Sequence, residues 1–202
     1  MWLTFISGSL ILTYPEVIPG IVYVYQQAFG GEPWNEGYLC PVCETAVALA
    51  DGPKECPECA KLGRSVIMVE YWPESKVVSD YYREMMRPGS LCVIARDNKE
   101  TIGFAWGYKV SVTPELDKHL EAPELHTLID GDFFYLDECA VVPQHQGKGF
   151  GALLMERVRG TSRRILLRTM DGSRMCRLVT RMGGKIVQHI SRGRVIMVLE
   201  SK

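Results

Sequence analysis

The sequence lacks any hydrophobic run long enough to cross a bilayer, and it lacks a strong charge of either sign. Its 202 residues include 23 lysines and arginines against 24 aspartates and glutamates, for a formal net charge of -1. A balance this close to neutral gives no general attraction to nucleic acid or to an anionic membrane. With 47% hydrophobic residues the composition is that of a globular protein, and the length suits one large core with room for a small insertion.

An export signal is also missing. The apolar opening from Trp2 to Leu12 has no basic residues before it and is interrupted by Ser7, Gly8 and Ser9, which does not fit a signal peptide. We interpret it as two short strands or the start of a strand, and we expect the protein to be cytoplasmic. Because the cytosol keeps thiols reduced, the seven cysteines indicate metal binding or free thiols, not a disulfide framework.

Hydrophobic periodicity predicts an alternation of helices and strands. Helices are expected over 18–29, 73–86, 150–158 and 175–182, and strands over 91–95, 102–108, 133–142, 165–167, 185–190 and 195–200. Residues 113–132 are polar and long for a loop, which is typical of a functional loop and leaves room for a short helix. This order predicts one α/β or α+β domain over residues 1–202 with a mixed sheet and a cysteine-rich insertion at 38–62.

A glycine-rich turn lies between an expected strand and an expected amphipathic helix, at residues 141–151. Gly147, Gly149 and Gly151 remove side chains from this turn, so that several backbone N–H groups can converge on an anion at the positive end of the helix dipole. A pyrophosphate would suit such a turn. The P-loop is excluded because no Gly-Lys-Ser/Thr follows, and the dinucleotide fingerprint is excluded by its glycine spacing and its missing downstream acid.

The turn also fits the pattern Gln/Arg-x-x-Gly-x-Gly/Ala, at Gln146, Gly149 and Gly151. In this motif, in the strand before it and in the helix after it, the chain resembles the GNAT superfamily of acetyltransferases. The resemblance covers everything except the insertion and residues 113–132. It implies a GNAT-type, mostly antiparallel sheet flanked by helices, and an N-acetyltransferase that transfers an acetyl group from acetyl-CoA to an amine.

The resemblance further implies a cofactor site. The pantetheine arm of acetyl-CoA would pair with the backbone of 139–142, and the pyrophosphate would rest on the amides of 146–151. The cofactor residues expected in this way are Cys139, Ala140, Val141, Val142, Gln146, Gly147, Lys148, Gly149, Phe150 and Gly151. Arg157, Arg159, Arg163 and Arg164 could meet the 3'-phosphate of CoA, although most cations in such a run face solvent.

A base is needed because only a neutral amine attacks a thioester. In the resembled family a glutamate on the fourth strand often takes the amine proton, and Glu138 is the matching residue. Its neighbour Asp137 is expected on the opposite face of the sheet, so one of the two should face the cleft. An ion pair between Glu138 and a neighbouring cation is the structural alternative.

Two positions depart from the family pattern. Val179 stands where the family has its general-acid tyrosine, and Gly172 stands where it has an asparagine. Water or another group, with Tyr135, Cys176 and Thr180 as candidates, must then protonate the leaving thiolate. The departure keeps open a second hypothesis, in which the protein is an acyl-CoA sensor or interaction module with little turnover that contacts a partner through its insertion.

The insertion carries its own pattern of two Cys-Pro-x-Cys turns, each able to aim two thiolates at one point. The four cysteines are Cys40, Cys43, Cys56 and Cys59. They predict a closed tetrahedral Zn2+ site, which is structural because no coordination position stays open. A redox-active pair and an iron centre are the alternatives for the same cysteines.

The acceptor site is the least defined by the sequence. Trp34 and Glu36 follow the first helix and would lie near the acceptor in a GNAT fold, although this segment also suits local packing. Nearby acidic residues favour a cationic amine, on a small molecule or a peptide. Since the insertion is rich in Glu and Asp, we expect no nucleic-acid partner, and we expect no membrane partner. A homodimer stays open.

Overall fold

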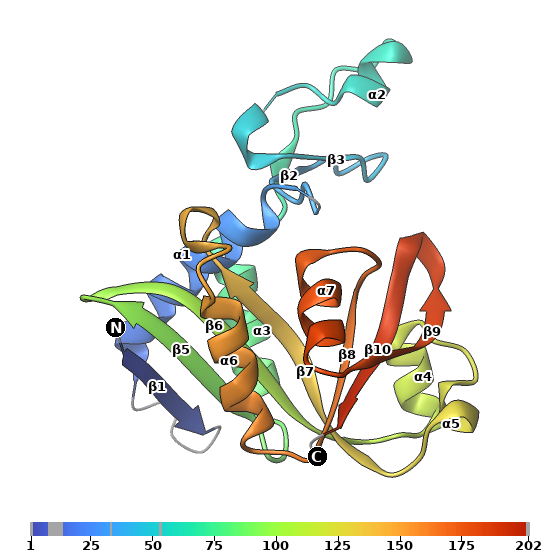
Figure 1. Ribbon diagram of the computed structural model, residues 1–202. Helices are drawn as coiled ribbons and strands as arrows, with labels where there is room; N and C mark the ends of the chain where they lie inside the picture. Colours follow the sequence, from blue (N-terminus) through green and yellow to red (C-terminus); the bar gives the residue numbers. More distant parts are fainter. Residues whose placement is uncertain (1, 8–13, 33, 53, 201–202) are drawn as a thin grey trace.

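The computed structural model describes residues 2–7, 14–32, 34–52 and 54–200, and it contains a seven-stranded sheet with helices on both faces (Figure 1). The strand order is β1-β5-β6-β7-β8-β10-β9. In this described sheet every neighbouring pair is antiparallel except β7 and β8, which are parallel. The prediction of a mixed, mostly antiparallel sheet is confirmed.

The elements predicted from periodicity all form. The strands of the sheet are β1 (Trp2–Ser7), β5 (Leu91–Asp97), β6 (Glu100–Ser111), β7 (Asp132–Val141), β8 (Arg164–Met170), β9 (Lys185–Ile190) and β10 (Arg194–Glu200). The helices around it are α1 (Ile18–Phe29), α3 (Glu74–Met85), α4 (Pro114–Leu120), α5 (Leu125–Leu128), α6 (Phe150–Arg159) and α7 (Arg174–Arg181). The predicted long loop therefore holds two short helices, and residues 8–12 of the predicted N-terminal strand segment lie outside the described residues.

Amphipathic helices cover both faces of the sheet (Figure 1). On one face α1 and α3 pack against β6 and β7, and α4 and α5 extend this layer over Tyr108 and Tyr135. On the other face α6 buries Leu154, Met155 and Val158 against β5, β6 and β7, and α7 lies beside it on β8 and β10. No helix in the described part of the chain combines the length and the hydropathy needed to cross a membrane.

A β-bulge interrupts β7 at Asp137. Across from it, Trp106 of β6 pairs with Glu138 while the next residue, Gly107, pairs with Leu136, so Asp137 has no partner of its own in this ladder. An extra residue of this kind bends and twists a strand. The parallel pairing of β7 with β8 covers residues 134–136 and goes no further. The two strands therefore separate beyond Leu136, and the gap between them becomes the site described below.

The bulge also changes which way the two carboxylates point. Tyr135 and Asp137 share a face by strand alternation, and Glu138 returns to that same face because it pairs with Trp106, which lies on the face of Tyr108. The prediction that Asp137 and Glu138 lie on opposite faces is thus wrong. One inserted residue brings both carboxylates to the face of the sheet that α1 and α3 cover.

The cysteine-rich insertion forms a separate small unit that projects from the end of the sheet near α1 (Figure 1). It contains β2 (Tyr38–Leu39), β3 (Ala46–Val47), β4 (Val69–Glu70) and the short helix α2 (Pro57–Lys61). Its strand order is β3-β2-β4, with Tyr38 opposite Glu70. The unit consequently reaches to Glu70, beyond the predicted end at residue 62, because β4 returns to pair with β2.

The close approach of β6 to the bulge gives a test of this register. In Gly107→Ala the new Cβ would collide with the carbonyl oxygen of Tyr135 and lie 2.7 Å from the Phe134 ring. Relieving such overpacking should cost roughly 1–3 kcal/mol of stability. Gly160→Ala is the matched control, because its Cβ would meet no atom closer than 3.5 Å. Urea unfolding should show a lower midpoint for Gly107→Ala alone, and equal midpoints would contradict the bulge.

Candidate functional site

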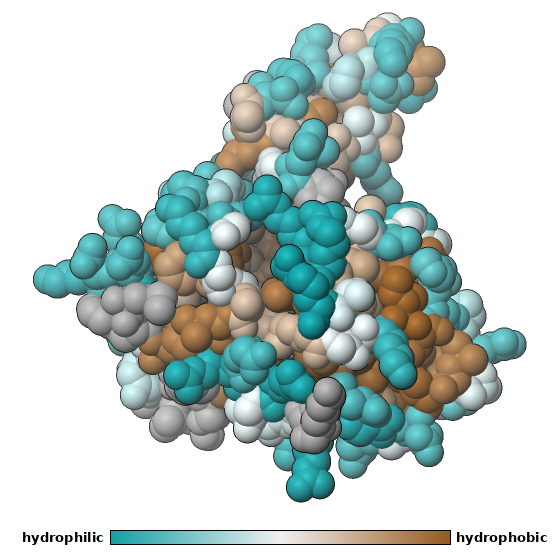
Figure 2. Space-filling model, in the orientation of Figure 1, coloured by the Kyte–Doolittle hydropathy of each residue, from teal (hydrophilic) through white to brown (hydrophobic). Residues whose placement is uncertain are grey.

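The gap between β7 and β8 opens into a cleft of about 710 Å³. Its floor is residues 135–141 of β7 and 167–169 of β8, one side is the glycine turn with the start of α6, and the other side is α7. Aromatic and acidic side chains from α1 and from the base of the insertion close one end. Figure 2 shows the hollow on this face, with hydrophilic side chains gathered over the neighbouring α7.

The glycine turn is built to present backbone donors. Gly147 has φ of 77° and Gly149 has φ of 89°, in the left-handed region that glycine adopts without strain. The Gln146 side chain donates a 2.9 Å hydrogen bond to the carbonyl oxygen of Val141 and so ties the turn to the end of β7. The first N–H groups of α6 have no acceptor within the helix. They and the helix dipole make this side of the cleft suitable for a phosphate.

Most residues expected at the cofactor line this cleft. These are Cys139, Ala140, Val141, Gln146, Gly147, Gly149 and Gly151. Since β7 has left β8 at this point, residues 139–141 have no strand partner on their β8 side, where the Val141 carbonyl oxygen accepts the Gln146 bond, and the backbone of Cys139 and the N–H of Val141 can pair with a ligand. Val142, Lys148 and Phe150 are not among the described lining residues. The cofactor role of all ten residues stays a prediction.

Cations also line the cleft, but not the ones that the sequence suggested. Arg174, Arg177 and Arg181 of α7 face it, across from the glycine turn. Of the arginines predicted near the 3'-phosphate, Arg159 lies 3.9 Å from Glu156 and Arg164 lies 3.2 Å from Glu200. The missed signal was the spacing of the three α7 arginines, which at i, i+3 and i+7 share one helix face.

Both predicted carboxylates lie on the cleft floor. Glu138 accepts a 2.8 Å hydrogen bond from the Tyr25 hydroxyl of α1, and Asp137 accepts a 3.4 Å bond from the Trp106 indole N–H. Tyr25 and Trp106 stack with their ring centroids 5.8 Å apart. Sequence reasoning missed Tyr25, because an aromatic residue at helical spacing looks like an ordinary core position. The Tyr25 bond therefore ties the Glu138 carboxylate to α1.

The surroundings raise the proton affinity of these carboxylates. Glu138 is accessible from the cleft but lies deep in the fold; burial raises its pKa well above the usual value, the charge of Asp137 adds to this, and the Tyr25 hydrogen bond opposes it. Burial raises the pKa of Asp137 to about 6, with the Glu84 carboxylate contributing. Burial and then Glu138 raise the pKa of Tyr25 well above 10, so this hydroxyl stays a donor. A carboxylate with a raised pKa is a suitable proton acceptor near neutral pH.

The acceptor end of the cleft contains the two predicted residues and two more. Trp34 and Glu36 line it, and so do Tyr71 and Trp72, which follow β4 at the exit from the insertion. The Trp72 indole N–H donates to a Glu36 carboxylate oxygen at 2.9 Å. The sequence reasoning did not identify Tyr71 and Trp72, since their place depends on the return of β4 to β2.

The position of the missing tyrosine is filled by a core residue. Val179 is fully buried between α7 and the sheet and has no proton to give. Of the substitutes that the sequence suggested, Tyr135 lines the cleft, whereas Cys176 and Thr180 are not among its described lining residues. The Thr180 hydroxyl is bound to the carbonyl oxygen of Cys176 at 2.9 Å.

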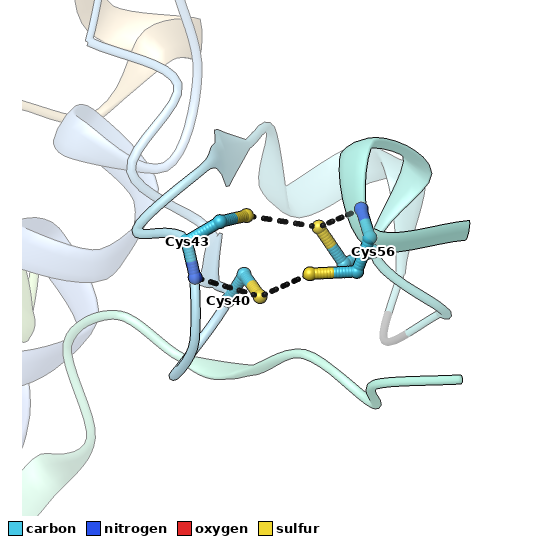
Figure 3. Close-up of side chains that lie close together, drawn as sticks. Cys40, Cys43 and Cys56 are labelled. Carbon is cyan, nitrogen blue, oxygen red and sulfur yellow. Dashed lines mark hydrogen bonds between the residues drawn. The ribbon is translucent and has the colours of Figure 1, made fainter. Parts of the chain in front are cut away.

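The four insertion cysteines come together as predicted (Figure 3). Their Sγ atoms all lie within 4.8 Å of one another, with Cys40 and Cys59 at 3.7 Å and Cys43 and Cys56 at 3.4 Å. A tetrahedral zinc site with Zn–S bonds of about 2.3 Å places its sulfurs about 3.8 Å apart. Backbone N–H groups point at Cys40 Sγ from Val42 at 3.4 Å and at Cys56 Sγ from Cys59 at 3.5 Å, which stabilises thiolates. The donor set fits a structural zinc ion.

Comparison with known proteins establishes the family. The family model described as "Acetyltransferase (GNAT) family" matches residues 60–183, more than half of the chain. The protein belongs to the GNAT acetyltransferase family. No curated protein sequence matches the chain.

Solved GNAT structures share the fold at low sequence identity. A Corynebacterium glutamicum structure titled histone acetyltransferase HPA2 and related acetyltransferase superposes with a TM-score of 0.58 and 17% identity, covering 100% of this chain and 98% of its own. Aminoglycoside 6'-acetyltransferase type Ii gives 0.56 and 12%, covering 99% and 97%. The PaiA N-acetyltransferase of Thermoplasma acidophilum, solved with coenzyme A, gives 0.53 and 11%, covering 100% of each chain. These structural similarities support the GNAT fold. Membership in the family supports acetyltransferase activity.

The cysteine geometry predicts one zinc ion per chain in purified protein, measured by elemental analysis. Cys59→Ser should lose the metal, because three thiolates no longer close the shell. Val42→Ser, which changes an exposed side chain inside the first Cys-Pro-x-Cys turn, should keep it. Wild-type protein without stoichiometric metal would show that the cysteines are free thiols.

A substitution at Gly151 can test the anion-binding turn, because Gly151 does not have a positive φ and alanine there causes no backbone strain. Its added Cβ would have Leu178 as its nearest neighbour at an ordinary 3.6 Å, so Gly151→Ala should fold normally. The same Cβ would crowd a phosphate that approaches the α6 amides, so calorimetry should show CoA binding weakened by about tenfold or more. Unchanged affinity would place the pyrophosphate elsewhere.

Proposed function

We propose that the protein is an N-acetyltransferase that transfers the acetyl group of acetyl-CoA to an amine. The observation that carries this proposal is that one cleft joins an anion-binding turn at one side to the Glu138 carboxylate on its floor. The first suits the phosphates of CoA, and the second suits an amine that must lose a proton. The backbone of 139–141, which has no β8 partner, lies between them, and a pantetheine arm could pair with its open groups.

The proposed reaction is a direct transfer. The amine nitrogen attacks the thioester carbon, the new C–N bond forms as the C–S bond breaks, and the amine proton passes to Glu138, directly or through water. The departing CoA thiolate takes its proton from water, because Val179 offers none and burial raises the pKa of Tyr135 well above 10. Arg174, Arg177 and Arg181 would neutralise the phosphates of the cosubstrate.

The acceptor in this proposal is a cationic amine, small or peptidic. Glu32 and Glu36 line the acceptor end together with Trp34 and Trp72, and carboxylates with aromatic faces attract ammonium groups. The four cysteines would hold a structural zinc ion, which takes no part in the chemistry. The proposed location is the cytoplasm, whose reducing conditions keep cysteine thiolates available for zinc.

The test is a panel of amines mixed with acetyl-CoA. An N-acetyl product identified by mass spectrometry, formed in step with free CoA thiol, would support the enzyme. Tight CoA binding with no product from any amine would instead support the sensor that the missing tyrosine allows. No CoA binding at all would contradict both.

Glu138→Gln should lower kcat by roughly 10²- to 10⁴-fold while acetyl-CoA affinity stays nearly constant, as expected for loss of a positioned base. The wild-type rate should fall on the acid side as Glu138 takes up its proton, and the variant should lack this limb. The ratio of the two rates therefore shrinks toward low pH. Asp137→Asn is the matched control and should keep the limb. Superimposable pH profiles for wild type and Glu138→Gln would rule out Glu138 as the base.

The same substitution should not weaken the fold, because the amide oxygen of the introduced glutamine can still accept the Tyr25 hydrogen bond. The folded pKa of Glu138 is raised, so its contribution to stability is present below its unfolded pKa and is lost as the pH rises through the folded pKa. The glutamine side chain does not ionise, so the variant does not lose this stability as the pH rises. Thermal melting at pH 7 should therefore give Glu138→Gln a Tm equal to or above wild type, which separates a catalytic defect from an unfolded one.

A further inference from the structure

The insertion and the cleft are joined at the two strands that enter and leave the insertion. The N–H of Tyr71 donates to the carbonyl oxygen of Gly37 at 3.0 Å, and the N–H of Gly37 donates to Val47 at 2.9 Å. These bonds continue the β3-β2-β4 sheet down to its base. Glu36 immediately precedes Gly37 and Trp72 immediately follows Tyr71, so both lie next to this hydrogen-bonded base of the insertion. The fold of the insertion therefore fixes the separation of these two cleft residues.

Glu36 and Trp72 are in turn connected to the carboxylate floor. Besides its bond to Glu36, Trp72 accepts at its carbonyl oxygen a 2.9 Å hydrogen bond from the Gln26 side chain of α1. The Trp72 ring meets the Tyr25 ring edge-on, with centroids 5.0 Å apart. Tyr25 donates to Glu138 at 2.8 Å. An unbroken series of contacts thus runs from the base of the insertion to Glu138.

The insertion has little besides its cysteines to hold it folded. In the described chain its buried hydrophobic cluster consists of Cys40, Cys56, Cys59 and Met68, with Tyr38, Val47 and Val66 partly buried around it. A core of this size does not stabilise a domain alone, and small domains of this kind depend on metal binding for their folding free energy.

We propose that the insertion is the acceptor-side wall of the active site, and that Glu36 and Trp72 are positioning residues through which its metal-bound fold holds this wall against the Tyr25 ring of α1. The activity readouts rest on the proposed acetyl transfer; the structural readout does not. The cofactor side is built from β7, the glycine turn, α6 and α7, which belong to the main core. Loss of the metal should consequently damage acceptor binding and spare CoA binding.

The structural test compares Cys56→Ser, chelator-treated wild type and Val42→Ser by hydrogen exchange. The first two should exchange faster within the insertion and also at residues 71–76 and 25–29, with no change across β7 and α6. Calorimetry should give a CoA affinity within about twofold of wild type. Val42→Ser should match wild type throughout. Faster exchange confined to 38–70 would overturn the proposal, because the insertion would then melt without moving the wall.

A second test separates positioning from direct substrate contact at Glu36. Glu36→Ala and Trp72→Phe each remove the indole hydrogen bond, and each should raise the acceptor KM by about tenfold with a smaller change in kcat. Glu36→Gln keeps an oxygen that can accept this bond, so it should restore the KM to near wild type. If Glu36→Gln is as impaired as Glu36→Ala, the charge of Glu36 acts on the acceptor itself and the positioning role is wrong. If neither wild type nor any variant has activity but the exchange pattern is as predicted, the proposed acetyl transfer is wrong. The structural role of the insertion as a wall of the cleft is then retained.

Trp72→Phe should also leave the pH profile of turnover nearly unchanged. The charged and titratable groups that face Glu138 are Tyr25 of α1, Asp137 of β7, Glu36 at the insertion base and Arg168 of β8. All of them remain in Trp72→Phe, which loses only an uncharged donor. Loss of the acid limb in Trp72→Phe, as expected for Glu138→Gln, would mean that Trp72 acts on the base itself and would overturn its role in the acceptor wall.

Discussion

The separation of β7 from β8 is the constraint on which the whole site depends. Parallel strands normally satisfy each other's backbone groups along their length, and here they stop doing so after Leu136, where Asp137 bulges out of the ladder with β6. The unpaired backbone that results would be costly if it were simply buried. It is tolerated at the edge of a cleft, where a ligand strand can pair with it. Gly107, opposite the bulge, allows β6 to approach closely enough to keep the rest of the sheet intact.

The same bulge sets the electrostatics of the floor. By turning Asp137 and Glu138 to one face, it places two carboxylates side by side on the cleft floor. Burial raises the pKa of both, the charge of Asp137 raises that of Glu138 further, and the charge of Glu84 raises that of Asp137. Tyr25 and Trp106 supply one hydrogen bond to each. Across the cleft the charge has the opposite sign, from the α6 amides and the α7 arginines. The site thus has a positive side for phosphates and a proton-accepting floor.

Local patterns in the sequence predicted much of this and missed what depends on pairing between distant segments. Helix α1 was predictable because Ile21, Val22, Tyr25 and Phe29 repeat at helical spacing, and the glycine turn and four cysteines were predictable because their chemistry depends on neighbouring residues. The bulge was not, since a one-residue slip between β6 and β7 is decided by packing across the sheet, and the alternation rule then gave the wrong face. Trp72 and the true end of the insertion were missed because β4 is very short and pairs with a strand far from it in the sequence. The α7 arginines were not identified from the sequence, because arginines on one face of a helix usually face solvent, and only the packing of α7 turns this face toward the cleft.

The most direct measurement is a structure of the protein with acetyl-CoA bound. The pantetheine should pair with the backbone of 139–141 on the side that β8 leaves open, the pyrophosphate should contact the amides of 147–151, and the thioester should reach the floor beside Glu138. Acetyl-CoA bound away from this gap, with the β7 backbone still unpaired, would contradict the assignment of the cleft.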